Sequence, residues 1–132
     1  MISIDVRPTE PRRRLELFFE GTVLTKSNMK TYNPRNRCYY IPVAWKAWEA
    51  NIATQFQFKV LKPFKMFEGP LEVHLEFFFL PKQRTDLSNA PKGFLDALNK
   101  LCWKDDRQIV RLVMDKKFSA AVPGVKMVVM EV

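Results

Sequence analysis

The alternating run LEVHLEFFFL, residues 71–80, constrains the fold of this chain most. Every second residue of the run is large and apolar, and Glu72, His74 and Glu76 lie between them. Because successive side chains of a strand point to opposite faces, the pattern predicts a strand that buries one face. Glu76 interrupts this apolar stretch and Pro81 ends it, well short of the roughly 20 residues that cross a bilayer. We therefore expect a sheet protein with no membrane span.

Three further strands and two helices are predicted around this run. Strand composition marks residues 14–20, 107–118 and 125–132, and helical periodicity marks residues 43–56 and 89–99. The last two strands are apolar on both faces, as expected of strands that are covered on both sides or paired across a dimer. Together these elements predict an α+β fold, in which two main helices flank a small mixed β-sheet.

Length and composition fit one folded domain. A chain of 132 residues buries one core, and eleven Phe, three Trp and three Tyr are too many for a disordered chain. We expect residues 15–132 to form a single domain and residues 1–14 to form a basic N-terminal arm. The prolines and the arginine run of the arm indicate a loosely held segment that can reach phosphate.

Several classes of site are not expected from this sequence. His74 is the single histidine and falls on the polar face of its strand, so neither zinc binding nor catalysis is expected of it. Cys38 and Cys102 form no CxxC pair, which disfavours a zinc site or a disulfide framework and fits a reducing cytosol. The first residues do not resemble a secretory signal, so we expect a cytoplasmic location.

Charge is the first functional clue. Twenty-two Lys and Arg against fourteen Asp and Glu give a net charge of +8, which suits a polyanionic partner such as nucleic acid. Residues 21–40 contain cations and tyrosines but no acid, as in a loop that follows a sugar–phosphate backbone and stacks a base. The alternatives are a merely soluble surface and a solvated loop with structural tyrosines. The candidate DNA-binding residues are Arg12, Arg13, Arg14, Lys26, Lys30, Arg35, Arg37 and Arg84.

Carboxylates flank the second predicted helix. Asp86 precedes residues 89–99, and Asp105 and Asp106 follow them. The helix is about 16 Å long, and residues 100–105 cover about 20 Å if they return as extended chain. The return leg then brings Asp105 and Asp106 back beside the helix N-terminus and Asp86. Only one member of the aspartate pair can face this site, because neighbouring residues of an extended chain point to opposite sides.

Two chemical interpretations of these carboxylates are possible. Close carboxylates repel each other unless a cation lies between them, and Mg²⁺ prefers oxygen ligands. Lys92, one turn beyond Ser88, projects toward the same end and could stabilise charge on a phosphate, which would complete a phosphodiesterase site. In the alternative, Asp86 only caps the helix and Asp105 forms a surface pair with Lys104. Spacing alone favours this alternative.

A resemblance to a known family changes that balance. Residues 85–110, TDLSNAPKGFLDALNKLCWKDDRQIV, resemble the pattern of the RusA family of Holliday junction resolvases. That pattern reads Asp-x-Asp-Asn-x-x-Lys, then Asp-Ala-Leu, then Asp-Asp-x-Gln-Ile, and the likeness extends over about residues 15–130. The matching residues are Asp86, Asn89, Lys92, Asp96, Ala97, Leu98, Asp105, Asp106, Gln108 and Ile109.

The resemblance implies a RusA-like fold and an activity. The activity is that of a Mg²⁺-dependent endonuclease, a homodimer that nicks two symmetric strands of a four-way junction. Such an enzyme acts on branched DNA in recombination and repair, in a bacterium or a phage-infected cell. The resemblance also implies that Asp86 and Asp106 bind the metal ion and that Lys92 is catalytic, with Asp105 as a further candidate ligand.

One position departs from the family pattern. The second acidic position is Ser88 here, whose hydroxyl can bind Mg²⁺ or one of its waters but brings no charge. Asp96 does not replace it, because eight residues of helix span about 12 Å. The departure leaves a second hypothesis open, a junction-binding protein with weak or no nuclease activity. A third hypothesis is a basic interaction protein whose aspartates only cap a helix.

Overall fold

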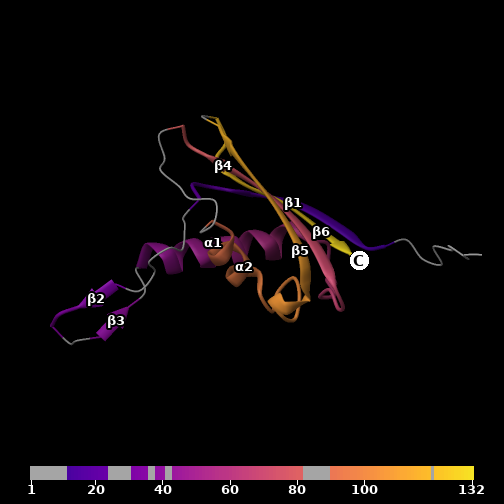
Figure 1. Cartoon of the computed structure of the whole chain (residues 1–132), viewed down its shortest axis with the longest axis horizontal. Helices are drawn as coiled ribbons and strands as arrows, with labels where there is room; N and C mark the ends of the chain where they lie inside the picture. Colours follow the sequence, from indigo (N-terminus) through magenta and orange to yellow (C-terminus); the bar gives the residue numbers. More distant parts are fainter. Residues whose placement is uncertain (1–11, 24–30, 36–37, 41–42, 82–89, 120) are drawn as a thin grey trace, which may run out of the picture.

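A computed structural model describes residues 12–23, 31–35, 38–40, 43–81, 90–119 and 121–132 of the chain. Figure 1 shows a twisted sheet with both helices on one side and a small hairpin beside them. In chain order the elements are β1 (Arg14–Glu20), β2 (Thr31–Asn33), β3 (Cys38–Tyr40), α1 (Val43–Lys59), β4 (Leu71–Phe79), α2 (Ala90–Leu98), the 3₁₀ turn η1 (Asp106–Gln108), β5 (Ile109–Phe118) and β6 (Gly124–Glu131). No helix among the described residues is long and apolar enough to cross a membrane.

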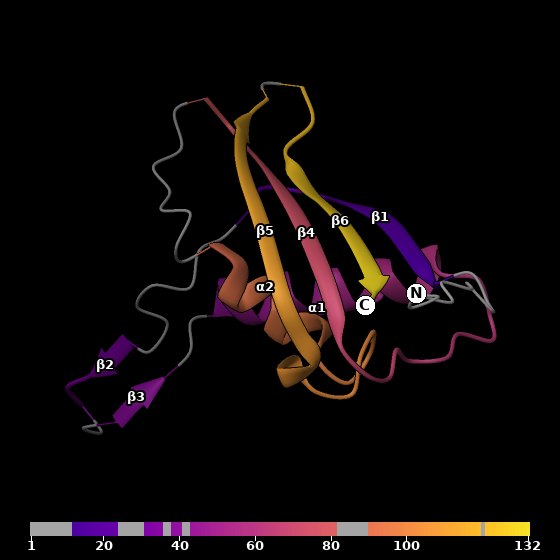
Figure 2. The ribbon, with the colours of Figure 1, turned by 45° about the vertical axis from the view of Figure 1, so that its right-hand side comes forward.

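The main sheet is mixed, with the strand order β1-β6-β4-β5. Strands β4 and β5 are parallel and connected through α2, whereas β6 runs antiparallel to both β4 and β1. Figure 2 shows α2 beneath β4 and β5, with α1 crossing below the sheet. The predicted α+β fold, a small mixed sheet flanked by two helices, is therefore confirmed.

The alternation of β4 separates the two faces of the sheet as predicted. The five apolar residues from Leu71 to Phe79 are fully buried, and the residues between them are half-buried. Phe94 of α2 packs edge-on against Phe19 of β1, with ring centroids 5.1 Å apart. The helix-covered face therefore holds the core. Fully burying one such side chain stabilises the fold by about 1.5–3 kcal/mol.

The opposite face of the sheet, which we call the open face, has no helix over it in the described part of the chain. Ion pairs join its strands, with Glu16 on Lys126 at 3.2 Å and Glu72 on Arg111 at 3.3 Å. His74 lies on this face and contacts Glu72, 2.7 Å from Nε2 to Oε2. The open face therefore pairs Glu16, Glu72 and Glu76 with cations of neighbouring strands.

Strand β5 differs from its prediction in two ways. Arg107 and Gln108, predicted to begin the strand, belong to η1 instead, and β5 begins at Ile109. The strand lies at the sheet edge, and Val110 and Phe118 are exposed, so within the single chain β5 is not covered on both sides, and its pairing across a dimer stays a prediction. Strand β6 is internal in the sheet, and its residues on the open face are half-buried.

Two further boundaries differ from the sequence prediction. Helix α1 continues three residues past its predicted end, to Lys59, whose ammonium donates to the Phe18 carbonyl of β1. Residues 21–40, predicted as a loop, contain the antiparallel strands β2 and β3. Figures 1 and 2 show this hairpin to one side of the main sheet.

Candidate active site

The connection from α2 to β5 is a tight turn. The Cys102 N–H donates to the Leu98 carbonyl at 3.0 Å, and the Lys100 N–H donates to the Trp103 carbonyl at 2.8 Å. Lys100 has a φ of 67°, which reverses the chain directly after the helix. The predicted extended return of residues 100–105 is therefore wrong, because hydrogen bonds close this segment onto the last turn of α2.

The turn holds Asp106 in a half-buried position. Trp103 is fully buried, and its Nε1–H donates to the Asp106 carboxylate at 2.6 Å. Burial raises the pKa of Asp106, the Trp103 hydrogen bond lowers it, and the nearby charges of Asp96 and Asp105 raise it further. Negative charge is thus concentrated here, and a bound cation would relieve the repulsion.

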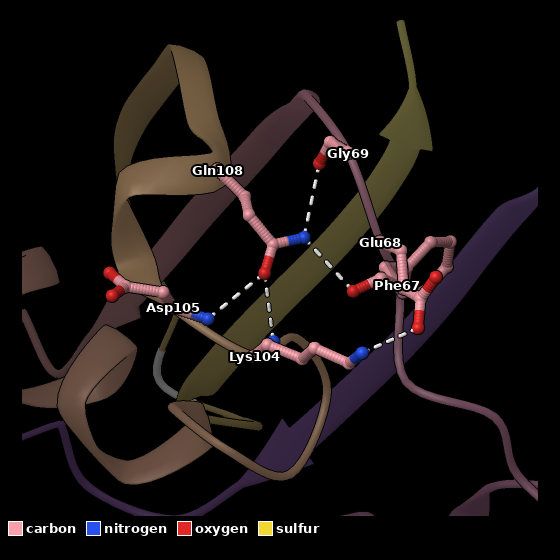
Figure 3. Close-up of polar contacts among 6 residues, drawn as sticks. All are labelled: Phe67, Glu68, Gly69, Lys104, Asp105 and Gln108. Carbon is pink, nitrogen blue, oxygen red and sulfur yellow. Dashed lines mark hydrogen bonds and ion pairs between the residues drawn. The ribbon is translucent and has the colours of Figure 1, made fainter.

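Asp105 and Gln108 build the turn itself, as Figure 3 shows for Gln108. Asp105 caps η1 by accepting from the Arg107 N–H at 2.9 Å. The Gln108 side-chain oxygen accepts from the N–H groups of Lys104 and Asp105, both at 2.9 Å. Its amide nitrogen donates to the carbonyls of residues 67 and 69, at 2.9 and 3.0 Å. Gln108 therefore fastens the turn to the segment that precedes β4.

The role of Gln108 was not predicted, although the sequence carries its signal. Asp105 and Gln108 stand at the first and last positions of a capping box, in which two side chains satisfy each other's backbone N–H groups. This capping gives Asp105 a structural role, and its role as a metal ligand stays a prediction. Lys104 forms its ion pair with Glu68, at 2.6 Å, instead of the expected pair with Asp105.

Helix α2 contributes Lys92 and Asp96 to the same region. The two residues lie four apart on the helix and are both exposed, so they occupy neighbouring positions on one face. Asp96 lies near enough to Asp106 for its charge to raise the Asp106 pKa. Asp96 was not expected to replace Ser88, and its proximity to Asp106 was not predicted, because residues 100–105 were expected to return as extended chain.

The structure describes only some of the predicted site residues. Of the DNA-binding candidates it describes, Arg12 and Arg35 are exposed, and Arg14 pairs with Glu16 at 3.1 Å. The Arg13 guanidinium lies over the rings of Phe67 and Phe64, at 4.2 and 5.0 Å from their centroids. The remaining candidates, which are Lys26, Lys30, Arg37, Arg84, Asp86 and Ser88, lie outside the described residues.

The donor chemistry of this region fits a divalent cation. Within the described ranges, no group of three or more His, Cys, Asp or Glu side chains is close enough to hold a metal ion. Asp106 nevertheless supplies a half-buried carboxylate beside the charges of Asp96 and Asp105, and carboxylate oxygens are ligands that Mg²⁺ accepts. The described part of a metal site would therefore be centred on Asp106.

The chain matches a known protein family over most of its length. The family model of endodeoxyribonuclease RusA matches residues 20–130. The match covers most of the 132 residues, so the chain belongs to the RusA family of endodeoxyribonucleases. A search of curated proteins finds no match. The resemblance of residues 85–110 to this family is thereby confirmed, and family membership implies Holliday junction resolvase activity.

Proposed function

We propose that this protein is a Mg²⁺-dependent endonuclease that resolves Holliday junctions and other branched DNA by paired symmetric nicks. Family membership supports the reaction class. The observation that carries the proposal is the placement of Asp106, half-buried, hydrogen-bonded by Trp103 and beside the charge of Asp96. The biological setting of the proposal is DNA recombination and repair in the cytoplasm of a bacterium or a phage-infected cell.

In this proposal, Asp86 and Asp106 hold the metal ion, and Ser88 and Asp105 are further candidate ligands. Bound Mg²⁺ supplies a Lewis acid and an activated water for phosphodiester hydrolysis. The Lys92 ammonium stabilises the negative charge that builds on the scissile phosphate. The Trp103 N–H orients the Asp106 carboxylate, because it fixes one carboxylate oxygen at 2.6 Å.

The proposal includes a homodimer. A four-way junction has two equivalent strands to cut, and a two-fold symmetric protein presents two equal sites to them. Val128 and Met130 of β6 are half-buried apolar residues on the open face, and Trp48 of α1 is half-buried. These residues supply surface for an interface between subunits. Sedimentation of the junction-bound protein as a monomer at micromolar concentration would contradict the dimer.

A nicking assay on a synthetic four-way junction tests the function. We expect nicks in two opposing strands only when Mg²⁺ is present, and no cleavage of a linear duplex of the same sequence. The Asp106→Asn variant should bind the junction as tightly as the wild type, or more tightly, because it removes a charge that repels phosphate. It should not cut. Equal cleavage by both proteins would overturn the proposed role of Asp106.

Ser88 motivates the alternative, a junction-binding protein with weak or no nuclease activity. The serine stands where the family pattern has a second carboxylate, and its hydroxyl adds no charge to the metal site. Ser88→Asp should lower the Mg²⁺ concentration needed for half-maximal nicking. A wild-type protein that shifts the junction in a gel without cutting it would favour the alternative. Equal binding to junction and duplex without cleavage would favour the basic interaction protein.

A further inference from the structure

A second surface beside the candidate active site has the chemistry of a DNA contact. A cavity of about 350 Å³ opens between the end of α1, the segment that connects α1 to β4, and the turn after α2. Its lining is mixed, with an apolar part, one amide and two ammonium groups. The lining residues that matter here are Gln57, Lys62, Phe64, Met66, Lys100 and Leu101.

The surroundings of this cavity carry positive charge. Residues 57–67 contain Lys59, Lys62 and Lys65 and no acid. Glu68 follows, and its pKa is lowered mainly by the hydrogen bond and charge of Lys104, with a smaller effect from Lys65. Its charge is thus already compensated. Within the described part of the chain, neither Lys62 nor Lys100 has an acidic partner, so both ammonium groups are available to an anion.

Lys100 occupies a backbone position that disfavours lysine. Its φ of 67° lies in the left-handed region, where glycine or asparagine is more easily accommodated. Lysine at this position places an ammonium on the lining of the cavity. Because the Lys100 N–H donates to the Trp103 carbonyl, the same turn carries both this lysine and the tryptophan that holds Asp106.

The apolar part of the cavity can stack a base. Phe64 is half-buried and packs edge-on against Phe56, with ring centroids 5.1 Å apart. Arg13 lies over the Phe64 ring at 5.0 Å, so the basic arm adjoins the same aromatic residue. Two large apolar side chains near the end of α1, Phe58 and Leu61, are 85% and 91% exposed. Cations interleaved with aromatic rings are the usual platform for unpaired nucleotides.

We propose that this cavity receives a nucleobase unstacked at the branch point of the DNA, while Lys62 and Lys100 bind the neighbouring phosphates. The inference rests on the proposed function, since only branched DNA presents such a base to a junction nuclease. It gives the chain a DNA contact on the same turn as Asp106, next to Arg13 of the arm. Base stacking tolerates any sequence, so the contact recognises the open branch point and not a base sequence.

The salt dependence of junction binding tests the lysines. Lys62→Gln combined with Lys100→Asn removes both charges, and asparagine tolerates the left-handed backbone, so this variant should fold at least as well at position 100. We expect the slope of log K against log salt to fall by about 2. The matched control, Lys117→Gln with Lys126→Gln, removes two cations of the open face and should leave the slope unchanged. Equal slopes for all three proteins would overturn the phosphate contacts.

Photocrosslinking tests the base. A junction with 5-iododeoxyuridine at the branch point should crosslink to Phe64 or Met66, identified by mass spectrometry of the peptides. The same nucleotide placed ten base pairs along one arm should not crosslink there. Branch-point crosslinks found only in the hairpin or the N-terminal arm would overturn the base contact. If the protein binds junction and duplex equally, the proposed function itself is contradicted. If it prefers the junction but does not form these crosslinks, only the base contact is contradicted.

Discussion

The pKa values of carboxylates in two regions of the molecule are shifted in opposite directions. On the open face, a hydrogen bond from His74 chiefly lowers the pKa of Glu72, and a hydrogen bond from Lys126 chiefly lowers that of Glu16. In the turn before β5, burial raises the pKa of Asp106, and the charges of Asp96 and Asp105 add to it. Glu16 and Glu72 are already paired with cations, whereas Asp106 lies beside the charges of Asp96 and Asp105 and has no cationic partner among the described residues.

The contrast extends to the basic residues. On the open face, cations such as Arg111 and Lys126 form ion pairs with acids, although the whole chain has a net charge of +8. Unpaired positive charge therefore concentrates elsewhere, and the end of α1 with the turn after α2 is one such place. Nucleic acid should accordingly approach the side of the helices and turns and not the open face, because phosphate binding follows unpaired charge.

The largest expected effect comes from Lys92, which lies in the first turn of α2. Lys92→Ala should slow single-turnover nicking by about 10²–10³-fold, because it removes a donor to the charge that develops on the phosphate. Lys126→Ala, which removes a lysine from the open face, should leave the rate unchanged. Single-turnover rates on the same junction at saturating Mg²⁺ measure both effects. Equal nicking rates for the two variants would show that the region of Lys92 is no more important for cleavage than the open face.

Trp103 sharpens the comparison, because it acts on Asp106 from inside the core. Trp103→Phe keeps the aromatic ring but loses the N–H donor, which should weaken Mg²⁺ binding by about 10–100-fold. The pKa of Asp106 should rise, since the hydrogen bond that lowers it is lost. Excess Mg²⁺ should restore nicking if Trp103 only positions the carboxylate. A variant whose nicking is unchanged at every Mg²⁺ concentration would show that this hydrogen bond has no role.

Substitution of two methionines of β6 compares how much each face of the sheet contributes to the free energy of unfolding. Met127 is fully buried on the helix-covered face, and Met130 is half-buried on the open face. Met127→Ala should cost about 2–5 kcal/mol of unfolding free energy, because it leaves a cavity in the core. Met130→Ala should cost less in urea unfolding of the dilute protein. A larger loss for Met130→Ala at high protein concentration would indicate that a second subunit covers the open face.

The smallest effect concerns Cys102, which lies within the turn and is fully buried. Burial raises its pKa to about 12, and the nearby charge of Arg13 lowers the pKa only partly. The thiol therefore stays protonated at pH 8, and only the thiolate reacts with iodoacetamide. Peptide mapping after alkylation should find Cys102 unmodified in the native protein and modified in urea. Modification of the native protein at pH 8 would show that the turn opens.

The sequence predicted the parts of this fold that follow a simple period. The alternation of residues 71–80 was sufficient to assign β4 and its two faces, and the second helix ends at Leu98, one residue before its predicted end. The turn after that helix was not predicted, because helix and strand periods say nothing of a lysine in the left-handed region. The proximity of Asp96 to Asp106 and the role of Gln108 both depend on that turn.

The central claim is that the turn before β5 binds a divalent cation and the open face does not. Isothermal titration of Mg²⁺ into the intact protein tests it without any cleavage. We expect wild type and Glu72→Gln to bind with the same affinity, and Asp106→Asn to lose more affinity than the roughly 10–100-fold expected of an outer-shell partner. Unchanged binding by Asp106→Asn, or a loss in Glu72→Gln that matches it, would contradict the account.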